Sequence, residues 1–161
     1  MISHCMKNDA PFGVILISDG GETGPAKTFD VGTLARIADW YQGSDGLLGV
    51  TAIGEQRFRL LSSRRQNDGL NVGTVETIPA EAEMPLPTRY GSLSTILEKV
   101  LDDLGRLYDS LERNYDSAVW VGYRFMEILP IDLEEKQQSL ESSDTIERLK
   151  LVDELLHSGP A

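Results

Sequence analysis

The chain has 161 residues and a formal net charge of −11, with 26 acidic and 15 basic side chains. This length suits one domain or two small units that share a core. The negative charge argues against a general nucleic-acid or anionic-membrane binder, because such proteins neutralise phosphates with Lys and Arg. No apolar run approaches the roughly 20 residues that cross a bilayer, and no secretory signal is evident. The single cysteine, Cys5, cannot form an internal disulfide, so we expect a reducing, cytoplasmic location.

Residues 12–78 predict a β-rich half. Short runs rich in Val, Ile, Thr and Gly alternate with the turn signals "DGG", "GSDG" and "NDGLN". The runs predict strands over residues 12–17, 31–40, 47–54, 56–61 and 72–78. Several short strands at this spacing indicate a sandwich or a small barrel.

The second half predicts helices, after a connection at 79–87 that holds three prolines. From Ser92 to Leu111, apolar residues recur at steps of three and four, which predicts one long apolar stripe. A second, almost wholly apolar helix follows a cap at Asp116 or Ser117 and ends before Pro130. A third helix starts at Asp132. A fourth starts at Ser143 or Asp144, buries Ile146, Leu149, Val152, Leu155 and Leu156, and ends near Gly159-Pro160.

The segment from Gly21 to Thr28 is close to a phosphate-binding loop, whose pattern is G-x-x-x-x-G-K-[ST]. Ala26 replaces the second glycine, which lets the backbone wrap the phosphates. A helix must follow such a loop, whereas "FDVGTLARI" predicts a strand. We therefore expect a loop between strands, and no cofactor.

Other chemistry has little support in the sequence. His4, Cys5 and His157 are the only soft metal ligands, and their spacing does not predict a metal site. There is no G-x-S-x-G elbow, and Cys5 has only its neighbour His4 as a general base. We predict no catalytic residue; a hydrolase using Cys5 or a serine is the weakest alternative.

Two groups of residues are candidates for binding. The apolar group, which could take polypeptide at a strand end, comprises Trp40, Tyr41, Leu47 and Leu48. The basic group, which could take RNA or an acidic partner, comprises Arg57, Arg59, Arg64 and Arg65. The apolar group could equally cap a barrel, and the basic group could be an exposed strand face followed by a turn.

Four segments in order carry a resemblance to a known family. They are "FGVILI" with the "GGETG" loop, "VGTLARI" followed by "DG", "IGEQRFRLL", and "ILPIDLEEKQQSLESSDTIERLKLVDELL". Together they resemble the Lon substrate-binding family, the N-terminal domain of the Lon ATP-dependent protease and its stand-alone relatives.

The resemblance implies an α+β fold, with a PUA-like small β-barrel subdomain over residues 1–88 and a helical bundle subdomain over 89–161. It implies a non-enzymatic module that captures unfolded or tagged polypeptides, with a protease or chaperone as a partner. The chain carries no Walker motif or Ser-Lys dyad that matches Lon's ATPase and protease. The family's usual first strand, with its Phe-Pro-Gly turn, is not seen before "MISHCMK". We therefore expect an open sheet edge that could support a homo-oligomer.

Overall fold

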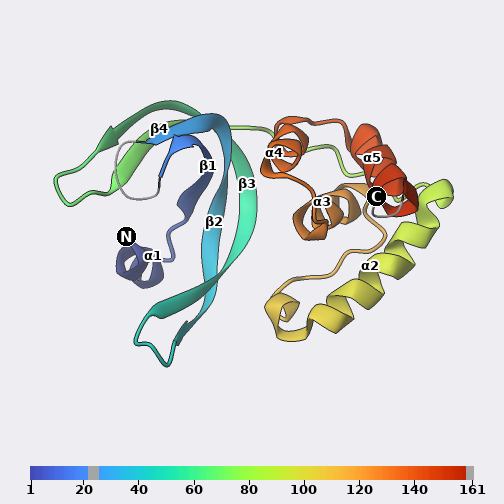
Figure 1. Ribbon diagram of the computed structural model, residues 1–161, viewed down its shortest axis with the longest axis horizontal. Coiled ribbons are helices and arrows are strands. Elements are labelled where there is room, and N and C mark those ends of the chain that lie inside the picture. Colours follow the sequence, from blue (N-terminus) through green and yellow to red (C-terminus); the bar gives the residue numbers. More distant parts are fainter. Residues whose placement is uncertain (22–25, 159–161) are drawn as a thin grey trace. The chain divides into compact units, whose positions relative to one another are not determined.

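The computed structural model describes residues 1–21 and 26–158, which fall into two compact units, Met1–Ala80 and Glu81–Ala161 (Figure 1). The first is a sheet unit with one short helix, and the second is a helical unit. None of the described helices has both the length and the apolarity needed to cross a bilayer.

The sheet unit is an antiparallel meander in the order β1-β2-β3-β4. Its strands are β1 (Phe12–Gly20), β2 (Ala26–Gln42), β3 (Leu48–Arg65) and β4 (Asn71–Thr77). The strands predicted at 12–17, 31–40 and 72–78 are confirmed. The prediction of separate strands at 47–54 and 56–61 is wrong, because both runs belong to β3. Gly54 stays in the ladder opposite Ala35, and a bulge absorbs the irregularity between Gly54 and Gln56.

Strands flank the glycine-rich loop on both sides, as predicted. β1 continues to Gly20, β2 starts at Ala26, and Lys27 pairs with Asp19. Lys27 and Thr28 are therefore strand residues, and the helix that a phosphate-binding loop requires is replaced by β2. Residues 22–25 of this loop lie outside the described residues.

Among the described residues, β1 pairs with β2 alone and β4 pairs with β3 alone. The sheet is therefore open at β1 and β4, and the barrel implied by the family resemblance stays an expectation.

Phe58 organises the core of the sheet unit. Its side chain is buried, and its ring lies against Gly32 on the neighbouring strand β2 and against Gly13 on β1. A Cβ at Gly32 would lie 2.5 Å from the Val14 carbonyl oxygen and 2.6 Å from Phe58 Cζ, so no larger residue fits without movement.

Helix α1 (Ile2–Asn8) joins the sheet through one arginine. Its C-cap, Asp9, has a left-handed backbone with φ 47°. Arg36 Nη1 donates to the Asp9 carbonyl at 3.0 Å, and Arg36 Nε donates to Glu55 Oε1 at 2.7 Å. Arg36 Nη1 also pairs with the Asp9 carboxylate at 2.7 Å. The side-chain bonds to Glu55 and then to Asp9 raise the pKa of Arg36.

The helical unit packs four α-helices and two 3₁₀ turns around one apolar core. They are η1 (Thr88–Tyr90), α2 (Gly91–Leu104), η2 (Gly105–Tyr108), α3 (Ala118–Ile128), α4 (Leu133–Glu141) and α5 (Thr145–Ser158). The largest fully buried side chains are Leu93, Leu97, Leu101, Val121, Leu149 and Val152. The predicted caps are confirmed: Ser117 accepts from Trp120 N, Asp132 from Glu135 N, and Asp144 from Glu147 N.

The long apolar stripe predicted from Ser92 to Leu111 is not one helix. α2 ends at Leu104 because Gly105 adopts φ 55°, and the tighter η2 follows. Leu104, predicted in the stripe, is 36% exposed. The predicted end of the last helix, Gly159-Pro160, lies outside the described residues.

The proline-rich segment after Ala80 is built into the helical unit. Leu86 N donates to the Asp116 carbonyl at 2.7 Å, and Ala118 N donates to the Met84 carbonyl at 2.8 Å. These backbone bonds fix the segment against the start of α3. The sequence shows no periodic pattern in this segment because backbone hydrogen bonds do not depend on the side chains.

Candidate binding surface

The β2–β3 hairpin extends past its neighbours in the sheet. β1 stops pairing with β2 at Ala35, and β4 starts pairing with β3 at Phe58. Residues 36–42 and 48–55 therefore form a two-stranded ribbon, which ends in the turn seen between β2 and β3 in Figure 1. Within the described residues, no other strand or loop forms backbone hydrogen bonds with the outer edges of this ribbon. Such edges present N–H and C=O groups to which a further strand can bond. On this ribbon, Trp40 N already donates to Asp39 Oδ1.

The turn of the ribbon is fixed by its own hydrogen bonds. Gly43 N donates to the Leu47 carbonyl at 2.8 Å, and Gly46 N donates to the Gly43 carbonyl at 2.9 Å. Asp45 Oδ1 accepts from Leu47 N at 3.0 Å, and Gly46 has φ 80°, which glycine adopts without strain. The turn thus holds Leu47 outward without help from a neighbouring element.

Three of the four apolar candidates lie on this ribbon, the fourth, Leu47, lies in its turn, and all four are exposed. Their exposed fractions are 54% for Trp40, 62% for Tyr41, 69% for Leu47 and 49% for Leu48. Exposure at this level indicates that none of them caps a closed core. Large apolar side chains gathered on one short segment are a feature of interaction sites.

Strand register divides the four residues between two faces. Trp40 pairs with Val50, and Gln42 pairs with Leu48, so Trp40 and Leu48 share one face. Tyr41 points to the opposite face, where its ring covers Gly49 so closely that a Cβ there would collide with it. Leu47 belongs to the turn. A ligand on one face would therefore contact Trp40 and Leu48, and one wrapped around the tip would also contact Tyr41.

The four arginines are spread along β3 rather than gathered. Arg57 and Arg65 are eight residues apart in one strand, which corresponds to about 26 Å at roughly 3.3 Å per residue. Arg64 and Arg65 are neighbours and point to opposite faces, and Arg59 lies across from Glu76. RNA binding by these residues stays a prediction, and this arrangement adds no support to it.

The soft metal ligands lie on helices. His4 and Cys5 are in α1, where Cys5 is buried and His4 is exposed and contacts Asn8. His157 lies near the end of α5 with Asp153. Within the described residues, no three His, Cys, Asp or Glu side chains are grouped to hold a metal ion.

The helical unit contains a buried ionic network that the sequence analysis missed. Arg148 Nη1 and Nη2 donate to the two carboxylate oxygens of Glu81 at 3.0 and 2.9 Å. Only 1% of the Arg148 side chain and 3% of the Glu81 side chain is exposed. The guanidinium also stacks 3.8 Å from the centre of the Tyr123 ring, and Tyr123 and Thr145 donate to Glu81. Both charges are therefore paired and hydrogen-bonded, as buried charges require.

The network changes the acidity of Glu81. Burial alone would raise the pKa of this carboxyl. The hydrogen bonds from Arg148, Thr145 and Tyr123, with the charge of Arg148, outweigh burial and lower the pKa from 4.5 to about 2. Glu81 is therefore ionised over the whole physiological range of pH.

Gly122 makes room for this arginine. A Cβ at Gly122 on α3 would lie 3.2 Å from Arg148 Cδ. A glycine inside an apolar helix and a charged residue beside Leu149 on α5 are the two signals that could have revealed the network. The face predicted for α5 is correct at Leu149 and Val152 but also includes Arg148 and Thr145.

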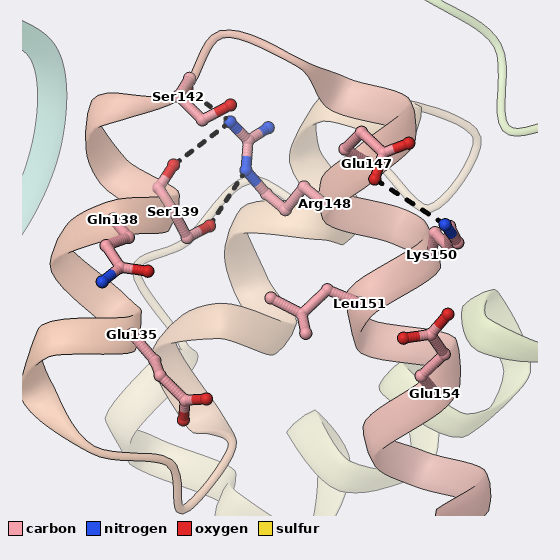
Figure 2. Close-up of a pocket in the computed structure, with 9 residues that line it drawn as sticks. All are labelled: Glu135, Gln138, Ser139, Ser142, Glu147, Arg148, Lys150, Leu151 and Glu154. Atoms are coloured by element: carbon pink, nitrogen blue, oxygen red, sulfur yellow. Dashed lines mark hydrogen bonds and ion pairs between the residues drawn. The ribbon is translucent and has the colours of Figure 1, made fainter.

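A shallow pocket of about 350 Å³ lies between α4 and α5 beside Arg148 (Figure 2). Arg148 closes one end by donating to Ser139 Oγ at 3.3 Å and to the Ser142 carbonyl at 2.9 Å. Leu151 forms an apolar wall, and the rim carries Glu135, Glu147, Glu154 and Lys150. Since the donors of Arg148 are engaged in the fold, this guanidinium is not available to a ligand in the pocket.

Comparison with known proteins connects these features to a family. The sequence profile described as the ATP-dependent protease La (LON) substrate-binding domain matches residues 1–158. The chain belongs to the Lon substrate-binding domain family. The resemblance drawn from four sequence segments is thereby confirmed over nearly the whole chain.

Two solved structures are similar to this family member. The crystal structure of the Lon N-terminal domain protein from Xanthomonas campestris has a TM-score of 0.72 and 32% identity, covering 99% of this chain and 82% of that one. The N-terminal domain of Mycobacterium avium complex Lon protease has a TM-score of 0.55 and 16% identity, covering 94% of this chain and 92% of that one. The second likeness shows the fold alone. The mixed helix-and-sheet fold expected from the family is therefore confirmed.

A curated relative matches part of the chain. Protein cereblon from Xenopus tropicalis is 33% identical over 90 residues, which are 54% of this chain and 19% of cereblon. The match thus spans about a fifth of that relative's length.

Proposed function

We propose that this Lon-type domain binds extended, partly apolar polypeptide segments at the ribbon formed by residues 36–42 and 48–55. One observation carries the proposal: the ribbon and its turn combine open backbone edges with four exposed apolar side chains. The family's description as a substrate-binding domain supports the same role.

The two features would act together. In an antiparallel ribbon, every second residue directs its N–H and C=O outward, so an extended peptide can add as a strand. Backbone bonds of this kind depend little on the peptide's sequence. Trp40 and Leu48 on one face, with Tyr41 on the other, would add affinity for apolar side chains that the peptide presents at alternate positions. Such a surface suits unfolded polypeptides, whose extended backbone and apolar residues are both exposed.

We further propose that the domain acts as a binder without chemistry of its own, in the cytoplasm, and delivers polypeptides to a protease or chaperone. The substrate-binding description of the family supports this. We also propose that the sheet unit is a small barrel of the PUA-like kind. A second copy could pair along the open edge at β1 or β4, which supports a homo-oligomer as a further possibility.

Fluorescence anisotropy with a labelled, uncharged peptide tests the binding proposal. The peptide alternates Leu and Tyr with Gln, so it can form a strand and carries no charge. Replacing Trp40 and Tyr41 together by Ala should weaken binding by at least about tenfold, since buried aromatic contacts dominate binding energies. Leu61→Ala is the matched control, because Leu61 is 59% exposed on β3 outside the ribbon. Equal binding by the double variant and the wild type would contradict the proposal.

A further inference from the structure

The ribbon has an unbalanced charge. Between Arg36, the first residue of the ribbon, and Arg57, the chain contains Asp39, Asp45 and Glu55 but no Lys or Arg. Glu55 is already paired with Arg36 at 2.7 Å. Asp39 and Asp45 therefore leave the ribbon with two negative charges that no neighbouring cation on it offsets.

Both aspartates lie beside the exposed apolar residues. Asp39 Oδ1 accepts from Trp40 N at 2.8 Å, and Asp45 Oδ1 accepts from Leu47 N at 3.0 Å. These bonds hold each carboxylate next to an exposed apolar side chain. The second oxygen of each carboxylate has no hydrogen-bond partner among the residues that the structure describes.

We infer that the ribbon selects polypeptide segments in which aromatic or aliphatic side chains alternate with Lys or Arg. This inference rests on the proposed function and adds the class of segment that the ribbon takes. A basic side chain next to a bound apolar one would reach Asp39 or Asp45 and pair with the carboxylate. It could also lie over the ring of Trp40 or Tyr41, which attracts cations. An acidic segment would instead meet like charge at both ends of the apolar patch.

Local charge, rather than the charge of the whole chain, decides this preference. The helical unit holds 17 acidic and 8 basic side chains, whereas the sheet unit holds 9 and 7. Most of the negative charge is therefore remote in sequence from the ribbon. Salt screens exposed charges beyond about 8 Å at physiological ionic strength. Under such conditions, Asp39 and Asp45 should account for most of the discrimination.

Three matched peptides test the inference. They share the alternating Leu and Tyr positions, and the intervening residues are Lys, Gln or Glu. At physiological salt we expect the Lys peptide to bind about tenfold more tightly than the Glu peptide, because each exposed ion pair contributes modestly. The double variant Asp39→Asn with Asp45→Asn should bring the two affinities to within about twofold, since Asn can still accept the backbone N–H bonds. The control, Glu98→Gln with Asp103→Asn, removes two exposed charges from α2 and should keep the tenfold ratio.

The outcomes separate the two claims. Equal affinity for all three peptides, with binding still lost when Trp40 and Tyr41 become Ala, would overturn the charge preference and leave the proposed function intact. A Lys-to-Glu ratio that survives the Asp39→Asn, Asp45→Asn change would also overturn it. Failure of every peptide to bind would overturn the proposed function itself.

Discussion

The two units of this chain treat charged and apolar side chains in opposite ways. The helical unit buries an arginine and a glutamate, Arg148 and Glu81, inside an otherwise apolar core. The sheet unit leaves a tryptophan and a tyrosine, Trp40 and Tyr41, more than half exposed at the end of a ribbon. Each choice costs free energy unless something compensates, and only the helical unit contains its own compensation. The difference indicates where a function lies, because more than half of each of these aromatic side chains is left uncovered by its own unit.

The largest effect should follow from breaking the buried pair. Glu81→Gln leaves the Arg148 charge buried without its carboxylate, so we expect the free energy of unfolding to fall by about 3–5 kcal/mol. Urea denaturation followed by circular dichroism measures this loss. The control is Arg113→Ala, which removes the exposed pair of Arg113 with Asp102 and should cost less than about 1 kcal/mol. Similar losses for the two variants would contradict the compensating role of the network.

The same pair should also make stability depend on acidity. The pKa of Glu81 is about 2 in the folded chain and 4.5 as a free side chain. As pH falls below 4.5, the unfolded chain takes up a proton at Glu81 before the folded chain does, so this contribution to stability declines and is lost near pH 2. The difference in unfolding free energy between wild type and Glu81→Gln should therefore be largest at neutral pH. It should shrink as the pH falls from 4.5 to about 2. A gap that stays constant down to pH 2 would show that ionised Glu81 does not stabilise the fold.

A smaller effect should follow from a change in the core of the sheet unit. Gly32→Ala would push a methyl group against Val14 and Phe58, so we expect a loss of about 1–3 kcal/mol. Gly91→Ala is the matched control, because a Cβ there meets nothing within 4 Å and its backbone is helical. Thermal unfolding of both variants measures the difference. A stable Gly32→Ala variant would argue against the close packing of Phe58 on this strand.

The smallest effect on stability should come from the ribbon itself. Because Trp40 and Leu47 are exposed, replacing either by Ala should change the free energy of unfolding by no more than about 0.5 kcal/mol. Denaturation curves of the two variants check this. A loss of several kcal/mol would mean that these side chains support the fold, which would remove the reason to assign them to binding.

Local signals in the sequence predicted much of the fold. Ser117, Asp132 and Asp144 cap helices where the sequence places them, because a short polar side chain before an apolar run satisfies the first backbone N–H groups. The strand starting at Phe12 also follows from a local signal, a short apolar run that ends at a turn sequence.

The errors have identifiable physical causes. Gly105 ends α2 inside a continuous apolar pattern, because periodicity records which residues are apolar and does not record backbone conformation. The sequence predicts that a strand ends at Gly54, but β3 continues beyond this residue through a bulge. The composition of a short stretch of sequence predicts neither the end of α2 at Gly105 nor the continuation of β3 through Gly54.

The candidate site was only partly predictable. The sequence singled out Trp40, Tyr41, Leu47 and Leu48, but their exposure and division between faces depend on strand register, which pairs residues from separate segments. The open edges depend on where β1 and β4 stop. The sequence did not predict the buried pair of Arg148 and Glu81, because the two residues lie 67 positions apart.

Photo-crosslinking tests the central claim most directly. A benzophenone side chain is placed in turn at Tyr41, Leu47, Leu61 and Leu133, all of which are at least 59% exposed. Each protein is irradiated with a permanently unfolded test polypeptide, and adducts are quantified by gel and mass spectrometry. We predict strong adducts at Tyr41 and Leu47 and weak ones at Leu61 and Leu133. Equal labelling at all four positions, or none at Tyr41 and Leu47, would contradict polypeptide binding at the ribbon.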